Sequence, residues 1–563
     1  MLETIQTMAA NISIFSSFKK LNSQLFQDRK DITAVYVFAI LSGIVQLSLP
    51  LGIQSIIGFV MAGSISTSII VLIFMVVFGV FVNGLLQVRQ LQIIEKIKQK
   101  IFFRYSFEYA NRIPKLDLEK LDSEYLPELV NRFFDSVSLQ KGVDKLLLDL
   151  PTAIIQVLLG LLLLSFYHPI FIGFGFLLLI IILAIIRYTS PQGLATAMKA
   201  SSYKYGVVAW LQEMARSVKT FKYSKDTEMH IKNTDALVSN YLVSKNQHFS
   251  ILMLQFWSLI SFKIIVTASM LILGSYLLVN QEINVGQFIA ADIVIISIIA
   301  SIEKIITNLD SVYDALVSIE KLNVVTEASV DKSGSILMEV KNEGLKVKVS
   351  NLSFAYGKNT EVIKNINFEI DKGKILQLKG VSGAGKSTIM RLFTGAYNQF
   401  TGEISLDGIP IRNFELYSLR KSMGIFLSNH DIFNDTLLHN ITMNCPGVSI
   451  DDVTKVVELT GFSEFMNETS DGYETILQPL GGRLSSKVRH TILLMRALLG
   501  DDNRLLLLED PFEYLEEPHK TNVKNYLKNL KNCTIIFASS SDLGTFPDKV
   551  VEISKDGELI LPN

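Results

Sequence analysis

Six long apolar stretches constrain this chain more than any other feature of its sequence. No charged residue occurs from Ile32 to Gly63 or from Ile65 to Val88, and each stretch exceeds the about 20 residues with which an apolar helix crosses a bilayer. Four more spans follow, two within 150–186 on either side of a Tyr-His-Pro turn, one at 252–279 and one at 283–302. Because charged residues make up only 19% of the chain, we expect transmembrane helices rather than buried helices of a soluble protein.

Basic residues predict how these spans are oriented. The turns near Gly63, His168 and Gln281 carry no Lys or Arg, whereas the segments at the other helix ends are rich in both. Since basic loops stay cytoplasmic, we expect a multi-pass protein of the cytoplasmic (inner) membrane with both termini in the cytoplasm. The inner connections, about 89–145 and 187–254, have helical spacing and are too long for loops, so we expect helical extensions of the spans.

The membrane part divides into an N-terminal helix and a six-span domain. Residues 1–30 lack the pattern of a signal peptide, and their stretch IFSSFKKLNSQLF suits an amphipathic helix at the membrane interface. We assign residues 31–325 to an all-α domain of six transmembrane helices surrounded by membrane lipid. With only about 30 residues before the first span, we expect no N-terminal peptidase domain.

Two charged residues fall within the predicted spans, Lys263 in the fifth and Asp292 in the sixth. Charge is costly inside a bilayer, so such residues either find a local partner or line a polar pathway. In the first interpretation Lys263 extends toward the inner surface and Asp292 makes one interhelical hydrogen bond. In the second, both line the path of a substrate. The sequence leaves the two interpretations open.

The second half of the chain has the pattern of an α/β domain. The composition changes near residue 335, and short β patterns then alternate with helical stretches. The pattern KILQLKG leads into GVSGAGKST, residues 380–388, which completes the motif G-x-x-x-x-G-K-[ST]. In such a loop the backbone N–H groups surround phosphate, Lys386 reaches the terminal phosphates and the Ser387 hydroxyl suits Mg²⁺. We therefore predict a P-loop nucleotide-binding domain over residues 336–563. The predicted phosphate contacts are Gly380, Val381, Ser382, Gly383, Ala384, Gly385, Lys386, Ser387 and Thr388.

A six-span domain followed by this domain resembles an ABC transporter of the exporter type, with both domains fused in one chain. The segments 419–441 and 481–499 and the stretch LLLLED at 505–510 are similar to motifs of that family. The resemblance implies ATP and Mg²⁺ as ligands, with Tyr356 stacked on adenine and Glu509 joining Ser387 at the metal. It also implies that Ser485 contacts ATP held by the opposite subunit of a homodimer, or of a heterodimer with a second half-transporter.

Four positions depart from the family pattern, and all of them concern hydrolysis. The family has Gln where this chain has Ser428, the signature LSGGQ is here LSSKV at 484–488, the Asp-Glu order is exchanged to Glu509-Asp510, and Ser539 replaces a switch histidine. Glu509 can still bind Mg²⁺, but Asp510 is one methylene short for a base that orients water. We expect a site that binds ATP and hydrolyses it slowly or not at all; normal turnover with a rearranged water is the alternative.

Two hypotheses of different classes follow. In the first, the chain is the ATP-binding transmembrane subunit of an exporter, and the stretch VNQEINVGQFIAAD resembles the branch that exports peptides and proteins with a periplasmic adaptor. In the second, it is a membrane-anchored ATP-binding regulator or scaffold without transport activity. We expect segments 122–133 and 203–214 to couple the two domains. A net charge of −1 gives no case for nucleic-acid binding.

Overall fold

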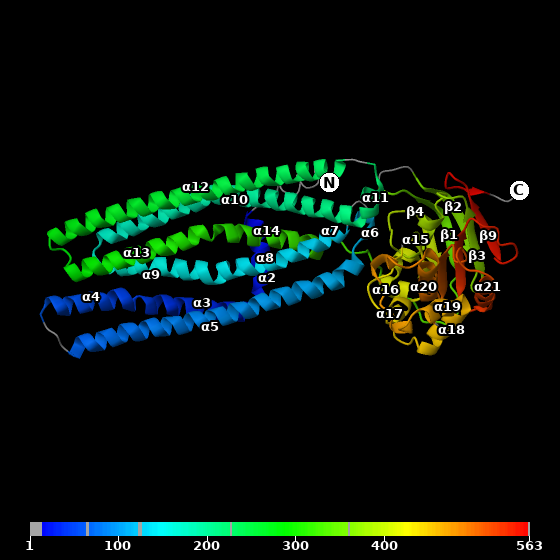
Figure 1. Cartoon of the computed structure of the whole chain (residues 1–563), viewed down its shortest axis with the longest axis horizontal. Coiled ribbons are helices and arrows are strands. Elements are labelled where there is room, and N and C mark those ends of the chain that lie inside the picture. The colour runs from blue at the N-terminus through cyan, green and yellow to red at the C-terminus, as the bar shows by residue number, and fades with distance from the viewer. Residues whose placement is uncertain are drawn as a thin grey trace. The chain divides into compact units, whose positions relative to one another are not determined.

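The computed structural model describes residues 14–63, 67–121, 126–225, 228–357, 361–428, 430–500 and 502–560. The chain divides into two compact units. The first comprises Met1–Lys115 and Glu124–Ala328, and the second comprises Leu116–Ser123 and Ser329–Asn563. Long helices make up the first unit, whereas the strands β1 to β10 all belong to the second (Figure 1).

Within the described residues, six helices are long and apolar enough to cross a membrane, as the sequence predicts. Three of them, α5, α10 and α12, are continuous over 46, 47 and 51 residues. The predicted inner connections therefore consist largely of extensions of these helices. The spanning helices are α3 (Arg29–Gln46) with α4 (Ser48–Met61), α5 (Thr67–Arg112), α9 (Leu150–Tyr167), α10 (Ile170–Arg216), α12 (Met229–Val279) and α13 (Val285–Thr307). The shorter helices of this unit are α2 (Ile14–Phe26), α7 (Leu126–Asn131), α8 (Asp135–Asp144), α11 (Val218–Tyr223) and α14 (Leu309–Thr326).

The predicted N-terminal helix is present as α2. Its Ser17 and Leu21 are buried, and Lys20 Nζ forms ion pairs with Glu320 at 2.9 Å and Glu327 at 3.3 Å. Helix α2 is thereby attached to α14. Residues 1–13 of the predicted segment lie outside the described part of the chain, and the position of α2 at a membrane interface stays a prediction.

The first span differs from the prediction because it is interrupted at Leu47, between α3 and α4. Pro50 has no N–H with which to donate to the Gln46 carbonyl, so a continuous helix would lose a hydrogen bond there. The Leu51 N–H donates to the Leu47 carbonyl at 3.3 Å and restarts the helical pattern. The apolar composition of the stretch concealed this break.

The two intramembrane charges have different surroundings. Lys263 Nζ pairs with Glu303 Oε2 at 2.7 Å, which joins α12 to α13. Asp292 on α13 is half-buried, and the ion pairs found among the described residues do not include it. Lys263 thus has an interhelical partner that neither interpretation named. Lining of a substrate path by Lys263 or Asp292 stays a prediction.

The second unit contains two sheets. In the six-stranded sheet, of order β10-β9-β3-β8-β7-β6, all neighbours are parallel except β10. The carboxyl ends of β3, β6, β7 and β8 therefore meet at one edge, where α/β folds bind ligands. Its strands are β3 (Ile375–Gly380), β6 (Met423–Phe426), β7 (Leu505–Glu509), β8 (Thr534–Ser539), β9 (Lys549–Ile553) and β10 (Leu559–Ile560). The four-stranded antiparallel sheet consists of β1 (Val347–Phe354), β2 (Ile363–Ile370), β4 (Thr401–Leu406) and β5 (Ile409–Pro410).

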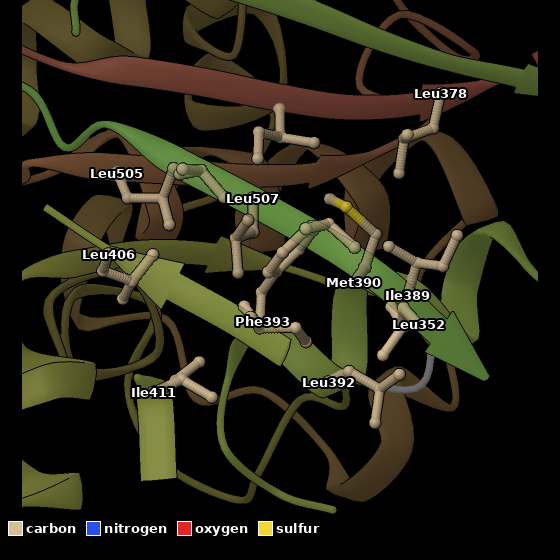
Figure 2. Close-up of a cluster of buried hydrophobic side chains, with 14 of the residues drawn as sticks. Leu352, Leu378, Ile389, Met390, Leu392, Phe393, Leu406, Ile411, Leu505 and Leu507 are labelled. Carbon is tan, nitrogen blue, oxygen red and sulfur yellow. The ribbon is translucent and has the colours of Figure 1, made fainter. Parts of the chain in front are cut away.

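The remaining helices cover the sheets. They are α15 (Lys386–Phe393), α16 (Leu416–Lys421), α17 (Leu437–Thr442), α18 (Ile450–Thr460), α19 (Ser463–Glu468), α20 (Ser486–Leu498) and α21 (His519–Asn529). Helix α15 follows the phosphate loop, and its Ile389, Met390, Leu392 and Phe393 are fully buried in the core shared with both sheets (Figure 2). This packing fixes the loop at the amino end of α15.

A short segment from between the long helices belongs to the second unit. Leu116 forms a β-bridge with Val330, the Asp117 N–H donates to the Ser329 carbonyl at 3.0 Å, and Glu119 on α6 (Leu118–Leu121) accepts from the Asn398 N–H at 3.2 Å. This segment lies just before the predicted coupling segment 122–133, of which residues 122–125 are outside the described residues. The other predicted coupling segment, 203–214, is part of α10.

Substitution of Phe393 tests the role of this core. Phe393 is 0% exposed, so Phe393→Ala should reduce the free energy of unfolding by about 3–5 kcal/mol through lost burial and a cavity. Thermal unfolding of the purified chain should show a clear loss in the melting temperature. Tyr417→Ala in the same unit, where the side chain is 76% exposed, should change stability by less than about 0.5 kcal/mol. Equal losses in the two variants would contradict the assigned core.

Candidate functional site

The phosphate loop turns tightly between β3 and α15 because glycine occupies its constrained positions. Gly383 and Gly385 have φ values of +85° and +91°, in the region that glycine adopts without steric cost. A Cβ at Gly380 would lie 2.6 Å from the carbonyl oxygen of Ile553, and one at Gly385 would lie 3.1 Å from that of Val362. The loop backbone can therefore approach a phosphate closely, as the motif predicts.

Lys386 completes this loop. Its Nζ donates to the carbonyls of Gly380 and Val381 at 2.7 and 2.9 Å. Val381, Ser382 and Gly383 are exposed at the same turn, and Ala384 is buried beneath them. The ammonium group and the amino end of α15 give the site positive character, which suits an anion.

Glu509, at the end of β7, joins α15 and the segment after β6 through one carboxylate. Its Oε1 accepts a hydrogen bond from the Ser387 hydroxyl, and its Oε2 accepts from the Ser428 backbone N–H at 2.8 Å. Hydroxyl and carboxylate oxygens are the hard ligands that Mg²⁺ uses together with phosphate oxygens and water. Ser387 and Glu509 therefore fit the metal that the family resemblance implies, and the exchange of Asp for Glu keeps the carboxylate within reach of the phosphate loop.

Ser428 approaches Glu509 with its backbone. The residue is exposed and follows strand β6 after Leu427. Its backbone N–H, and not its side-chain hydroxyl, donates to the carboxylate of Glu509. A glutamine at this position could extend an amide toward the metal and water, whereas the serine side chain ends one atom beyond Cβ. The predicted loss of reach at Ser428 fits this arrangement.

Asp510 is half-buried beside the phosphate loop and has a φ of +45°. Burial raises the pKa of its carboxyl group above the usual range, and a hydrogen bond with Ser539 and the charge of Lys386 oppose this shift. Ser539 is buried at the end of β8, and its Oγ accepts from the Ser541 N–H at 3.2 Å. Asp510 and Ser539 thus bond to each other at the sheet edge, close to Lys386.

Tyr356 contacts α15, the helix that follows the phosphate loop. Its hydroxyl is 3.1 Å from the Thr388 hydroxyl and accepts from Arg391 Nη1 at 3.3 Å, while its ring makes edge contacts with Phe354 and Tyr397. Tyr356 is therefore tied to the helix that follows the loop. Stacking on adenine stays a prediction. Arg391 was absent from the predicted site, because nothing in its spacing distinguishes it from a surface arginine.

The predicted signature residue Ser485 is exposed and caps α20, where its Oγ accepts from the Val488 N–H at 3.2 Å. Next to it, Lys487 pairs with Glu516 at 2.7 Å. The hydrogen bonds of the described residues do not connect Ser485 with the phosphate loop of its own chain. A second residue of α20, His490, was not predicted, yet its Nε2 lies 3.0 Å from the Asp510 carbonyl oxygen.

Comparison with known proteins agrees with this arrangement. A family model described as "ABC transporter" matches residues 363–513, and one described as "ABC transporter transmembrane region" matches residues 32–301. A structure of a bacterial Atm1-family ABC exporter with ATP bound superposes with a TM-score of 0.84 over 94% of both chains, at 18% sequence identity. That likeness concerns the fold alone.

Curated relatives match parts of the chain. The alpha-hemolysin translocation ATP-binding protein HlyB of Escherichia coli O157:H7 is 28% identical over 335 residues, which are 58% of this chain and 46% of that protein. The ATP-dependent lipid A-core flippase of Aliivibrio fischeri is 32% identical over 217 residues, 38% of this chain and 37% of that protein. The chain thus spans about half the length, or less, of these relatives.

Removal of the Lys386 ammonium group tests the phosphate site. Lys386→Ala should weaken binding of a nucleoside triphosphate at least about tenfold, because a hydrogen bond to a charged group contributes about 1.5–3 kcal/mol. Equilibrium binding of a fluorescent ATP analogue to the full chain measures the effect. Lys379→Ala is the matched control, since Lys379 lies on β3 just before the loop and its Nζ is 3.8 Å from Asp542 Oδ2. Equal effects of the two substitutions would contradict the site.

Proposed function

We propose a function on the premise that this chain belongs to the ABC transporters, as an exporter-type half-transporter with a transmembrane region fused to an ATP-binding domain. It binds ATP with Mg²⁺ at the phosphate loop, hydrolyses the nucleotide slowly, and couples nucleotide binding to export of a peptide or protein across the cytoplasmic membrane. Its Tyr356 receives the adenine, and Ser387 and Glu509 hold the metal ion.

The contrast between two parts of one site carries this proposal. The groups for phosphate and metal, Lys386, Ser387 and Glu509, converge through hydrogen bonds at the edge of the sheet. The groups for water are short: Ser428 reaches the site with its backbone, and Asp510 has one methylene fewer than glutamate. A displacement of about 1 Å between a catalytic group and its substrate costs on the order of a hundredfold in rate. Binding without rapid turnover is the expected result.

The relatives support a polypeptide substrate. The match to HlyB, a protein named for translocation of alpha-hemolysin, covers 335 residues, which is longer than the second unit and therefore extends into the transmembrane part. Matches to lipid A-core flippases reach 298 residues and also exceed the second unit, but the HlyB match is longer than these. We infer that this chain exports a peptide or protein, in a complex that can include a periplasmic adaptor.

We further infer that the working form is a dimer with a second half-transporter. The exposed signature residue Ser485 makes no bond to the phosphate loop of its own chain among the described residues, so a second chain is needed to bring a signature motif to the nucleotide. Two copies of this chain would place two slow sites opposite each other. A heterodimer with a chain that has a complete site avoids this, so we propose the heterodimer.

Turnover measured in lipid tests the proposed slow hydrolysis. The triple variant Ser428→Gln, Glu509→Asp, Asp510→Glu places longer groups at the water side of the site and the shorter aspartate at the metal side. Its Lys386-dependent ATPase rate should exceed that of the wild-type homodimer by about a hundredfold. A wild-type rate of about 1 per second or more, abolished by Lys386→Ala, would refute slow hydrolysis.

Isolation of the intact complex from native membrane separates the proposal from a role as regulator or scaffold. We expect a second half-transporter with glutamate and histidine at the catalytic positions, and ATP-dependent transport by the reconstituted pair. A complex that binds ATP but contains no second half-transporter would favour the regulator.

A further inference from the structure

Asp510 adopts a backbone conformation that residues other than glycine disfavour, and three hydrogen bonds hold its backbone there. Its φ of +45° lies in the left-handed region, where Cβ approaches the following carbonyl. The Asp510 N–H donates to the Ala538 carbonyl on β8 at 2.8 Å. The Asp510 carbonyl accepts from the Glu513 N–H at 3.1 Å, within the turn after β7, and from Nε2 of His490 at 3.0 Å, the one of the three bonds that a side chain donates. Unfavourable backbone conformations of this kind persist where surrounding contacts determine them.

The imidazole of His490 is fixed in its place. It is buried, and its ring makes edge contacts with Phe426 at 4.7 Å and Tyr514 at 5.0 Å between ring centroids. Because a carbonyl oxygen only accepts, Nε2 must carry the proton. Nδ1 is buried and has no hydrogen-bond partner among the described residues, and burial lowers the pKa of His490. Among the described residues, the neutral ring therefore makes one hydrogen bond, to the Asp510 carbonyl.

This bond influences where the Asp510 carboxylate points. The direction of Cβ depends on φ, so a residue released from φ +45° would move its carboxylate away from Lys386 and the Ser387–Glu509 contact. His490 also belongs to α20, five residues after the cap Ser485. One helix therefore carries the signature residue at its amino end and the imidazole that holds Asp510.

We propose that His490 is a positioning residue, whose Nε2–H bond to the Asp510 carbonyl keeps the Asp510 carboxylate beside the phosphate loop and connects that carboxylate to the signature helix α20. The inference rests on the proposed ATP site and deepens it. Neither the phosphate-loop motif nor the carboxylate pair at the end of β7 assigns a role to His490.

Equilibrium binding of MgATP to the full chain in lipid tests the inference without any need for hydrolysis. Asp510→Asn removes a negative charge near the triphosphate and should tighten binding at least about fivefold. The same substitution is then made beside His490→Gln, whose amide can reach the carbonyl, and beside His490→Asn, whose shorter amide cannot. The gain in MgATP affinity should stay at about fivefold beside His490→Gln and fall below about twofold beside His490→Asn.

Each outcome decides a separate point. A gain that persists beside His490→Asn, or that disappears beside His490→Gln, would overturn the positioning role, because packing alone would then explain the contact. An Asp510→Asn variant that binds MgATP no tighter than wild type would overturn it as well. Wild-type binding no stronger than that of Lys386→Ala would instead refute the proposed ATP site. Thermal unfolding of every variant confirms that the compared proteins are folded, and the Gln and Asn variants differ by only one methylene.

Discussion

The carboxylate of Glu509 organises the nucleotide site of this protein through its contacts with two neighbouring segments. Its two oxygens accept from the Ser387 hydroxyl and the Ser428 N–H, so the end of β7, the first turn of α15 and the segment after β6 are connected at one point. Parallel strands bring their carboxyl ends to the same edge, and the fully buried leucines of β7 hold this edge in the core. This contact ties the phosphate loop to the sheet edge, and Asp510 lies next to it.

The exchange of Asp and Glu affects the two functions of the site unequally. A metal ion accepts a carboxylate that arrives on a longer side chain, because the backbone of Ser428 and the hydroxyl of Ser387 meet it there. A water molecule in line with a phosphate has a stricter geometry, since small misplacements are costly in rate. The half-buried Asp510, bonded to Ser539 and held at φ +45°, has little freedom to compensate for its shorter side chain. This difference is the physical basis of the proposed slow turnover.

The sequence predicts the parts of this structure that repeat a local pattern. Uncharged stretches predicted six spanning helices, and a glycine-rich motif between a strand and a helix predicted the phosphate loop. The break at Leu47 was missed because Pro50 stands in an otherwise ordinary apolar span. The partner of Lys263 was missed because Glu303 lies 40 positions away on another helix. His490 was missed for a further reason, because its partner is a backbone carbonyl. Every residue type has such a carbonyl, so the sequence does not reveal the contact.

The pair of Lys263 and Glu303 has a consequence for biogenesis. The Lys263 charge alone would add a few kcal/mol to the cost of placing α12 in lipid, and the 2.7 Å contact with Glu303, just past the predicted sixth span, neutralises it. Helices α12 and α13 are neighbours joined by the short turn at 280–284. The contact therefore favours their entry into the bilayer together, as one hairpin released from the translocation channel, over insertion of α12 first and α13 later.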